Sequence, residues 1–210
     1  MISAIVLAAG MSSRYGSQNK LLLPFGEGSV VRCTVQAVLQ TKVDQVLVIT
    51  GHDCEKIEAA LIDLPVSFVY NPQYREGEML SSIQTGLRYL GSLQTKAVSE
   101  TASVYIDATM IVLGDQPLLP VPLMKLMMRA FDRNCGEIIA PRFQNLRGHP
   151  VLMARKWWAN ALAIPPGHNL RDLLKAHPEA VSFIQVNSDI ILRDVDTPEA
   201  YVEVCELAGV

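Results

Sequence analysis

The fold is constrained most by a continuous apolar run near the N-terminus, Ser3 to Ala8 (SAIVLA), which is followed closely by Gly10. A short run rich in Ile and Val, without polar alternation, is typical of a strand buried on both faces. Similar runs follow along the chain, QVLVIT at 45–50, VSFVY at 66–70 and MIVL at 110–113. Several such strands together require helices on both sides of one sheet.

Helical spacing of apolar residues fills the intervals between these runs. It predicts helices over 30–40, 53–61, 82–90, 121–132, 169–176 and 198–207, and further strands are predicted at 137–140, 150–154 and 181–186. The polar segment 91–107 is expected to be a surface excursion. The alternation predicts an α/β fold with a mainly parallel, doubly wound sheet in three layers. No repeat or linker divides the chain, so we expect a single domain over residues 1–210.

Composition excludes several classes of protein. The chain has 18 basic and 21 acidic residues and a net charge of −3, which argues against broad binding to nucleic acid or anionic membranes. The four cysteines form no CxxC pair, so neither a zinc cluster nor a thioredoxin-like site is indicated. The N-terminus lacks a charged segment before its apolar run, and no apolar stretch approaches ~20 residues. We therefore expect a cytoplasmic protein with no nucleic-acid or membrane partner.

The loop after the first strand is suited to a polyanion. It begins with small residues, where a ligand can touch the backbone, and it carries the cations Arg14 and Lys20. Neither usual phosphate motif is present: Gly10 and Gly16 are six residues apart, and Lys20 comes four residues after Gly16. The loop predicts binding of a triphosphate, with a merely solvated surface connection as the alternative.

A carboxylate follows the strand at 110–113, in the sequence GDQP. Ligands of such folds bind beyond the carboxyl ends of the strands, so Gly114 and Asp115 are expected beside the first loop. A carboxylate next to a polyanion is repulsive unless a cation lies between them, and Mg²⁺ takes carboxylate and phosphate oxygens. Asp194 and Asp196 are candidates for a second carboxylate, with helix capping as the alternative for each.

The loop RFQNLRGHP contributes candidates for binding a second substrate. Gly148 and His149 lie in this loop directly before a predicted strand. We predict that they contact the acceptor, and a structural hydrogen bond is the alternative role for His149.

Five sequence blocks resemble a known family. LAAGMSSRYGSQNKLLLPFG resembles the opening of nucleotidyltransferases, while NPQYREGEMLSSI, GDQP, RGHPVLM and DVDTPEAY follow in the order of the molybdenum cofactor cytidylyltransferase branch of the MobA-like NTP transferase superfamily. The resemblance covers nearly the whole chain and implies a Rossmann-like nucleotidyltransferase fold. Three residues separate Gly16 from Lys20, where the family usually has two.

The resemblance also implies residue roles. The residues that would bind the nucleotide are Leu7, Ala8, Ala9 and Gly10 at the base and ribose, Ser82 at the base, Gly114 beside it, and Arg14 and Lys20 at the triphosphate. Asp115 and Asp196 would bind Mg²⁺. Arg14, Lys20 and Asp115 are therefore the expected catalytic residues.

The implied reaction transfers a nucleotide from an NTP to a phosphorylated acceptor and releases pyrophosphate. The form LAAG, rather than LAGG, resembles cytidylyl enzymes, so CTP and molybdopterin are the expected substrates. Transient docking to a molybdoenzyme or its chaperone is also expected. Three alternatives stay open: a nucleotidyltransferase for a sugar or polyol phosphate, a dinucleotide-binding oxidoreductase, and a non-catalytic cofactor-binding protein. The missing GxGxxG counts against the oxidoreductase.

Overall fold

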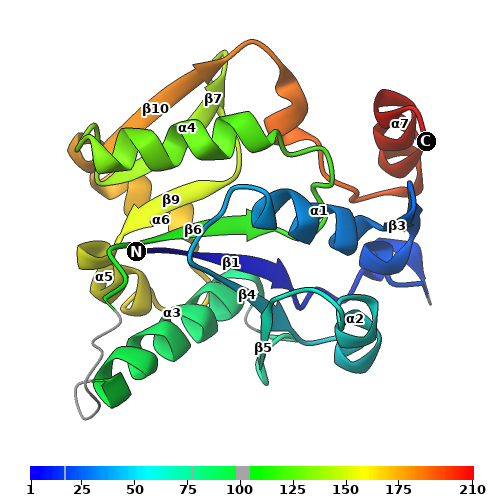
Figure 1. Cartoon of the computed structure of the whole chain (residues 1–210), viewed down its shortest axis with the longest axis horizontal. Coiled ribbons are helices and arrows are strands. Elements are labelled where there is room, and N and C mark those ends of the chain that lie inside the picture. The colour runs from blue at the N-terminus through cyan, green and yellow to red at the C-terminus, as the bar shows by residue number, and fades with distance from the viewer. Residues whose placement is uncertain (17, 77, 98–104) are drawn as a thin grey trace.

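A computed structural model describes residues 1–16, 18–76, 78–97 and 105–210 (Figure 1). Its main sheet has eight strands, in the order β10-β7-β9-β6-β1-β4-β5, with β8 paired to β7. The strands are β1 (Ile2–Ala8), β4 (Gln45–Thr50), β5 (Ser67–Tyr70), β6 (Ala108–Leu113), β7 (Ile138–Phe143), β8 (Leu146–Arg147), β9 (Val151–Ala154) and β10 (Val181–Val186). A two-stranded sheet pairs β2 (Pro24–Phe25) with β3 (Gly28–Ser29).

The mainly parallel sheet expected from the sequence is confirmed. β1 pairs in parallel with β4 and β6, β4 with β5, and β7 with β10. β9 runs antiparallel to both neighbours, β6 and β7. The chain between β7 and β9 is shorter than the dozen or so residues that a parallel crossover needs, so it returns in the opposite direction.

Helices cover both faces of the sheet, as the three-layer prediction requires. Their bounds are α1 (Val30–Leu39), α2 (Cys54–Ala60), α3 (Glu78–Ala97), α4 (Val121–Asp132), α5 (Trp158–Leu162), α6 (Leu170–Ala176) and α7 (Pro198–Ala208). α1, α2 and α4 share one apolar core, and α3, α5 and α6 share another. In Figure 1, α1 and α4 lie in front of the sheet and α6 lies behind it.

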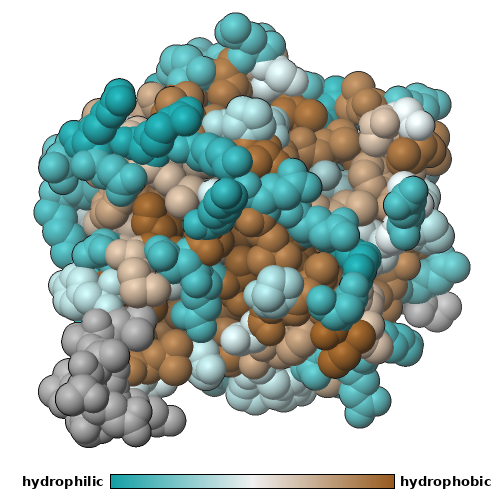
Figure 2. All heavy atoms as spheres, viewed as in Figure 1, coloured by the Kyte–Doolittle hydropathy of each residue, from teal (hydrophilic) through white to brown (hydrophobic). Residues whose placement is uncertain are grey.

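The strands divide their side chains between these two cores. Along β1, Ala4, Val6 and Ala8 belong to the core under α1 and α4, whereas Ile5 and Leu7 face the α3 side. This follows from the two-residue period of a strand. On the surface of the molecule that carries α1 and α4, polar residues surround a patch of apolar atoms (Figure 2).

Helix α3 differs most from the sequence prediction. It begins at Glu78 rather than Ser82 and continues to Ala97, so the first part of the expected surface excursion at 91–107 is helical. Its buried residues Ile83, Leu87 and Leu90 hold it against the sheet. Residues 98–104 lie outside the described residues, and Ile106 beyond them is fully buried.

At the carboxyl ends of β1 and β6, the backbones of the two chain segments approach each other closely. Gly114 follows β6, and its N–H donates to the carbonyl of Leu7 at 3.0 Å. A Cβ on Gly114 would lie 2.6 Å from that same carbonyl oxygen. Gly91, inside α3, has nothing within 4 Å of the corresponding position.

We expect two glycine-to-alanine substitutions to have opposite effects on the free energy of unfolding. Gly114→Ala should lower it by about 1–3 kcal/mol, because the backbone of Leu7 cannot move aside. Gly91→Ala should raise it by roughly 0.5–1 kcal/mol, because alanine favours the helix. Urea unfolding of both variants measures the difference, and an unaffected Gly114→Ala variant would contradict the close approach.

The turn between β8 and β9 packs against the segment Asp189–Leu192. A Cβ on Gly148 would lie 2.5 Å from the carbonyl oxygen of Ile191, and His149 N–H donates to that oxygen at 3.2 Å. Burial lowers the pKa of His149 to about 4, and the positive charges of Arg147 and Arg171 act in the same direction.

The lowered pKa of His149 makes stability depend on pH. Below the pKa of an unfolded histidine, about 6.5, the unfolded chain takes up a proton that folded His149 refuses until the pH reaches about 4. The free energy of unfolding should therefore fall across this window as the pH falls. His149→Gln lacks this contribution, so its stability should fall less between roughly pH 7 and pH 5. Urea unfolding at both pH values tests this, and equal losses in the two proteins would contradict it.

Candidate active site

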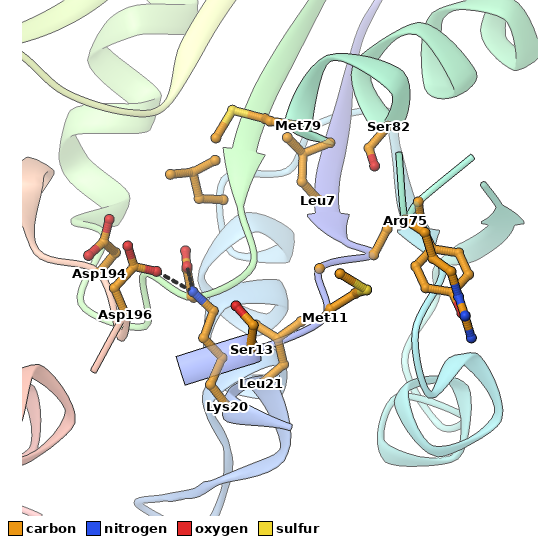
Figure 3. Close-up of a pocket in the computed structure, with 15 residues that line it drawn as sticks. Leu7, Met11, Ser13, Lys20, Leu21, Arg75, Met79, Ser82, Asp194 and Asp196 are labelled. Atoms are coloured by element: carbon orange, nitrogen blue, oxygen red, sulfur yellow. Dashed lines mark hydrogen bonds and ion pairs between the residues drawn. The ribbon is translucent and has the colours of Figure 1, made fainter. Parts of the chain in front are cut away.

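A cleft of about 370 Å³ opens at the carboxyl ends of β1 and β6. It extends from the start of α3, which contributes Met79 and Ser82, to Asp194 and Asp196 on the opposite side (Figure 3). The residues that line it are Leu7, Ala9, Gly10, Met11, Ser13, Lys20, Leu21, Tyr74, Arg75, Met79, Ser82, Leu113, Asp115, Asp194 and Asp196.

Buried polar side chains hold the loop after β1 in shape. Ser12 has a left-handed backbone (φ 51°) and donates from Oγ to Asn19 Oδ1 at 3.2 Å. The same Oγ accepts the backbone N–H of Lys20 at 3.1 Å, and Asn19 Oδ1 accepts the N–H of Leu21 at 3.1 Å. Asn19 therefore caps the short helix that begins at Lys20, and this cap directs the lysine into the cleft.

The Lys20 ammonium joins two carboxylates from distant parts of the chain. Its Nζ lies 2.5 Å from Asp115 Oδ2 and 2.5 Å from Asp196 Oδ1 (Figure 3). Burial lowers the pKa of Lys20, but the charge of Asp115 and hydrogen bonds to both carboxylates outweigh it and leave that pKa raised. Lys20 thus carries a positive charge that is largely shielded from solvent, with its side chain 14% exposed.

Asp196 also pairs with Arg14, whose Nη1 lies 2.9 Å from Oδ2. Burial raises the pKa of Asp196, but hydrogen bonds and charge from Lys20 and Arg14 outweigh it and lower that pKa below its usual value. Asp194 behaves differently, because burial and the charges of Asp115 and Asp196 raise its pKa to about 6. The cleft therefore holds carboxylates in two electrostatic environments.

The oxygen atoms in this part of the cleft suit a divalent cation. Asp115 Oδ1 is buried and has no hydrogen-bond partner in the described part of the chain. Among those residues, no three His, Cys, Asp or Glu side chains are close enough to form a metal site by themselves. The donors fit a cation such as Mg²⁺ or Mn²⁺ that takes one or two carboxylates and completes its shell with substrate oxygens.

The opposite end of the cleft is organised by Asn71, which is completely buried. Its Oδ1 accepts the backbone N–H of Gln73 at 3.0 Å, which turns Nδ2 toward α3. Nδ2 donates to the Oγ atoms of Ser81 and Ser82, at 2.8 and 3.0 Å. Since Ser82 Oγ accepts from Asn71, and no described residue accepts its hydroxyl proton, Ser82 is arranged to donate into the cleft.

Most residues that the sequence singled out meet in this cleft. Eight of them line it, namely Leu7, Ala9, Gly10, Lys20, Ser82, Asp115, Asp194 and Asp196. Arg14 reaches it through Asp196, whereas Ala8 is completely buried below it and Gly114 packs on Leu7.

The two predicted acceptor contacts are not among the lining residues. Gly148 packs on Ile191, and His149 is half-buried beside Arg147, so their role toward the acceptor stays a prediction.

Sequence analysis missed the loop after β5. Tyr74 and Arg75 line the cleft although no role was assigned to them. The signal was available, because this loop follows a parallel strand and must emerge at the same edge of the sheet as Gly10 and Asp115. No comparable feature of the sequence indicated that Met11, Ser13 and Met79 would line the cleft.

Comparisons with known proteins agree with this geometry. The family model described as "MobA-like NTP transferase domain" matches residues 4–181. The "Molybdenum cofactor cytidylyltransferase" of Escherichia coli K12 is 26% identical over 202 residues, covering 96% of this chain and 94% of that protein.

No helix in the described residues has the length and apolar character needed to cross a membrane.

Two solved structures share the fold. A Mycobacterium tuberculosis protein in complex with manganese has a TM-score of 0.77 at 21% identity, with 98% of both chains covered. A putative glucose-1-phosphate thymidylyltransferase from Bacillus anthracis, in complex with a sucrose, has a TM-score of 0.79 at 16% identity, covering 99% of this chain and 95% of that one. On the match over residues 4–181, the chain belongs to the MobA-like NTP transferase family and is a nucleotidyltransferase.

Proposed function

We propose that this protein is a cytoplasmic CTP:molybdopterin cytidylyltransferase, which transfers CMP to the phosphate of the pterin cofactor and releases pyrophosphate. The observation that carries the proposal is the Lys20 ammonium, which lies between Asp115 and Asp196 at the end of the loop after β1. The Escherichia coli relative, named for this activity, aligns with 96% of the chain and supports the choice of substrates.

The base and ribose fit the end of the cleft formed by β1 and α3. Leu7, Met79 and Leu113 provide apolar walls for a flat ring. Ser82, arranged by Asn71 to donate a hydrogen bond, suits an acceptor atom on the base. Cytosine presents two such atoms, the carbonyl O2 and the ring N3, whereas the N3 of uracil carries a proton. Uracil still presents O2 and O4 as acceptors, so the hydroxyl of Ser82 is compatible with CTP, and the choice of CTP rests on the Escherichia coli relative.

The triphosphate would lie along the loop after β1, toward Lys20 and Arg14. An acceptor phosphate attacks the α-phosphorus from the side opposite the leaving pyrophosphate, and negative charge grows on that leaving group. Lys20 and Arg14 are positive before the substrate arrives, and they neutralise this charge when they exchange their carboxylate partners for phosphate oxygens. The acceptor phosphate is already anionic, and the reaction needs no general base.

Asp115 and Asp196 are the residues that would hold the metal, for which we propose Mg²⁺. The partnerless Oδ1 of Asp115 is the oxygen best placed to become a ligand. When bound, the ion supplies positive charge to the phosphate oxygens. Asp194 lies beside these carboxylates, and with its pKa raised to about 6 it is still mostly ionised near pH 7.

Product delivery by transient docking to a molybdoenzyme or its chaperone is part of this proposal. A second candidate is nucleotidyl transfer to a sugar phosphate, which the thymidylyltransferase-like neighbour from Bacillus anthracis favours. The two functions share the nucleotide end of the cleft and differ only in the acceptor.

Turnover tests the proposed substrates directly. The protein incubated with CTP, Mg²⁺ and molybdopterin should release pyrophosphate in proportion to the pterin dinucleotide formed, as measured by a coupled phosphate assay and chromatography. GTP and ATP in place of CTP should support much slower release. Release with glucose 1-phosphate but not with molybdopterin would favour the second candidate, and no release with either acceptor would contradict both.

Removing the Lys20 charge should impair catalysis, and it should also lower stability, because Asp115 and Asp196 lose the partner that they share. We expect Lys20→Met to lower kcat by about 10²–10³-fold, the usual loss when one preorganised charge is removed. The control is Lys125→Met on α4, which contributes no residue to the cleft, and its kcat should equal that of the unsubstituted protein. Thermal midpoints of both variants would separate a folding defect from lost catalysis, and an unchanged kcat for Lys20→Met would contradict the role of this lysine.

A further inference from the structure

A second cavity, of about 400 Å³, lies between the edge strand β10, the β7–β8 hairpin and α6. Four of its lining residues are cationic, namely Arg142, Arg147, Arg171 and Lys175, and none is acidic. Phe183, Leu174 and Leu146 supply apolar surface beside them. The cavity therefore combines concentrated positive charge with an apolar wall.

The four cations have no anionic partner. No side-chain hydrogen bond or ion pair is made by any of them within the described part of the chain. Two nearby acids are engaged elsewhere: Asp172 accepts the backbone N–H of Asn169 at 3.0 Å, and Glu179 lies 3.2 Å from His177. The excess of positive charge in the cavity is thus uncompensated.

Arg142 is the most telling of the four. Its Nε is buried without a hydrogen-bond partner, an arrangement that is costly unless a ligand supplies an acceptor. Its guanidinium carbon lies 3.6 Å from the centre of the Phe183 ring, and this stacking holds the group in place. The guanidinium is therefore preorganised rather than mobile.

The positive charges around the cavity also affect the pKa values of Arg147 and His149. Burial, then the charge of Arg171, lowers the pKa of Arg147. His149 is affected by both arginines, as described above. An anion in the cavity would relieve this repulsion, because the charge of Arg171 acts directly on Arg147.

This cavity is separate from the nucleotide cleft. The two share no lining residue. β9 and β6 lie between β7 and β1 in the sheet, so three strand spacings of ~4.8 Å place Arg142 of β7 roughly 14 Å from the β1 strand.

We propose that this cavity binds the phosphoryl group of a small organic phosphate, with the aromatic or apolar body of that molecule packed against Phe183 and Leu174. Guanidinium groups bind phosphate oxygens in pairs, and several cations together match a dianion better than a single carboxylate. The ligand is either a separate effector or an extended part of the acceptor substrate, and both would present the same group.

Phenyl phosphate is a suitable probe, because it carries the phosphoryl group on an aromatic ring and lacks a triphosphate. Calorimetric titration of the full chain, with the nucleotide cleft saturated by CTP and Mg²⁺, should show one site. Arg171→Gln/Lys175→Gln removes two exposed cations four residues apart on α6 and should raise Kd at least tenfold. In parallel, the pKa of His149, followed by NMR, should rise when the probe binds.

The matched control is Lys125→Gln/Arg129→Gln, which removes the same charge at the same spacing from α4 on the opposite face. Its Kd should stay within twofold of the unsubstituted value. Equal affinity in both double variants, absence of binding to the unsubstituted protein, or displacement of the probe by CTP would overturn the proposal.

The source of the natural ligand follows from kinetics of the α6 double variant. This arm alone rests on the proposed function. A raised KM for the acceptor with an unchanged KM for CTP identifies the ligand as part of the acceptor. Unchanged KM values together with weakened binding of the probe identify a separate effector. A failed turnover assay would leave the binding result standing, so the two proposals fail independently.

Discussion

The contact between Lys20 and the carboxylates of Asp115 and Asp196 is the interaction on which the active site depends. It joins Lys20 to Asp115, 95 positions further along the chain, and to Asp196, 176 positions further along. The ammonium that makes both contacts is largely hidden from solvent. Buried charges are tolerated only when they are paired. The loop after β1, the end of β6 and the segment before α7 are therefore held together by the same groups that would meet the substrate.

The sheet makes this contact possible by bringing two strand ends unusually close. The backbone of Gly114 approaches Leu7 at a distance that leaves no room for a Cβ, so the β6 carboxylate stands directly beside the β1 loop. On the other side, Ser12 and Asn19 set the position of Lys20 through hydrogen bonds within the loop. Gly114, Ser12 and Asn19 do not line the cleft, yet they decide where its charges lie.

The molecule carries positive charge in two different arrangements. At the nucleotide cleft, Lys20 and Arg14 are matched by carboxylates, so the site is nearly balanced before a ligand and a divalent cation arrive. At the edge of the sheet, the cations around Arg142 pair with no carboxylate among the described residues. A balanced site can exchange its partners during a reaction, whereas an unbalanced one is suited to holding an anion.

Much of the fold was predictable because local pattern and tertiary environment agree. The helix at 121–132 and the strand at 181–186 have the predicted bounds. Proline marks the start of the helix, and the strand is recognisable without an alternating pattern of burial. The extension of α3 past Gly91 was not predicted, because packing of Ile83, Leu87 and Leu90 stabilises a helix whose later residues are polar. The direction of β9 was likewise left open, because a strand's sequence does not specify which neighbour it pairs with.

The sequence by itself determined the layered α/β architecture, and it indicated that Lys20, Asp115 and Asp196 belong to one site. The architecture follows from the hydrophobic period, and Asp115 follows from its place directly after a strand, both of which are local properties, whereas the metal role of Asp196 was implied by the family resemblance. Only the tertiary structure decided that Lys20 bridges the two carboxylates, that Asn71 orients Ser82, and that Arg142, Arg147 and Arg171 share one cavity. Those relations join residues far apart in the chain, and they depend on the order in which strands assemble, which no local pattern encodes.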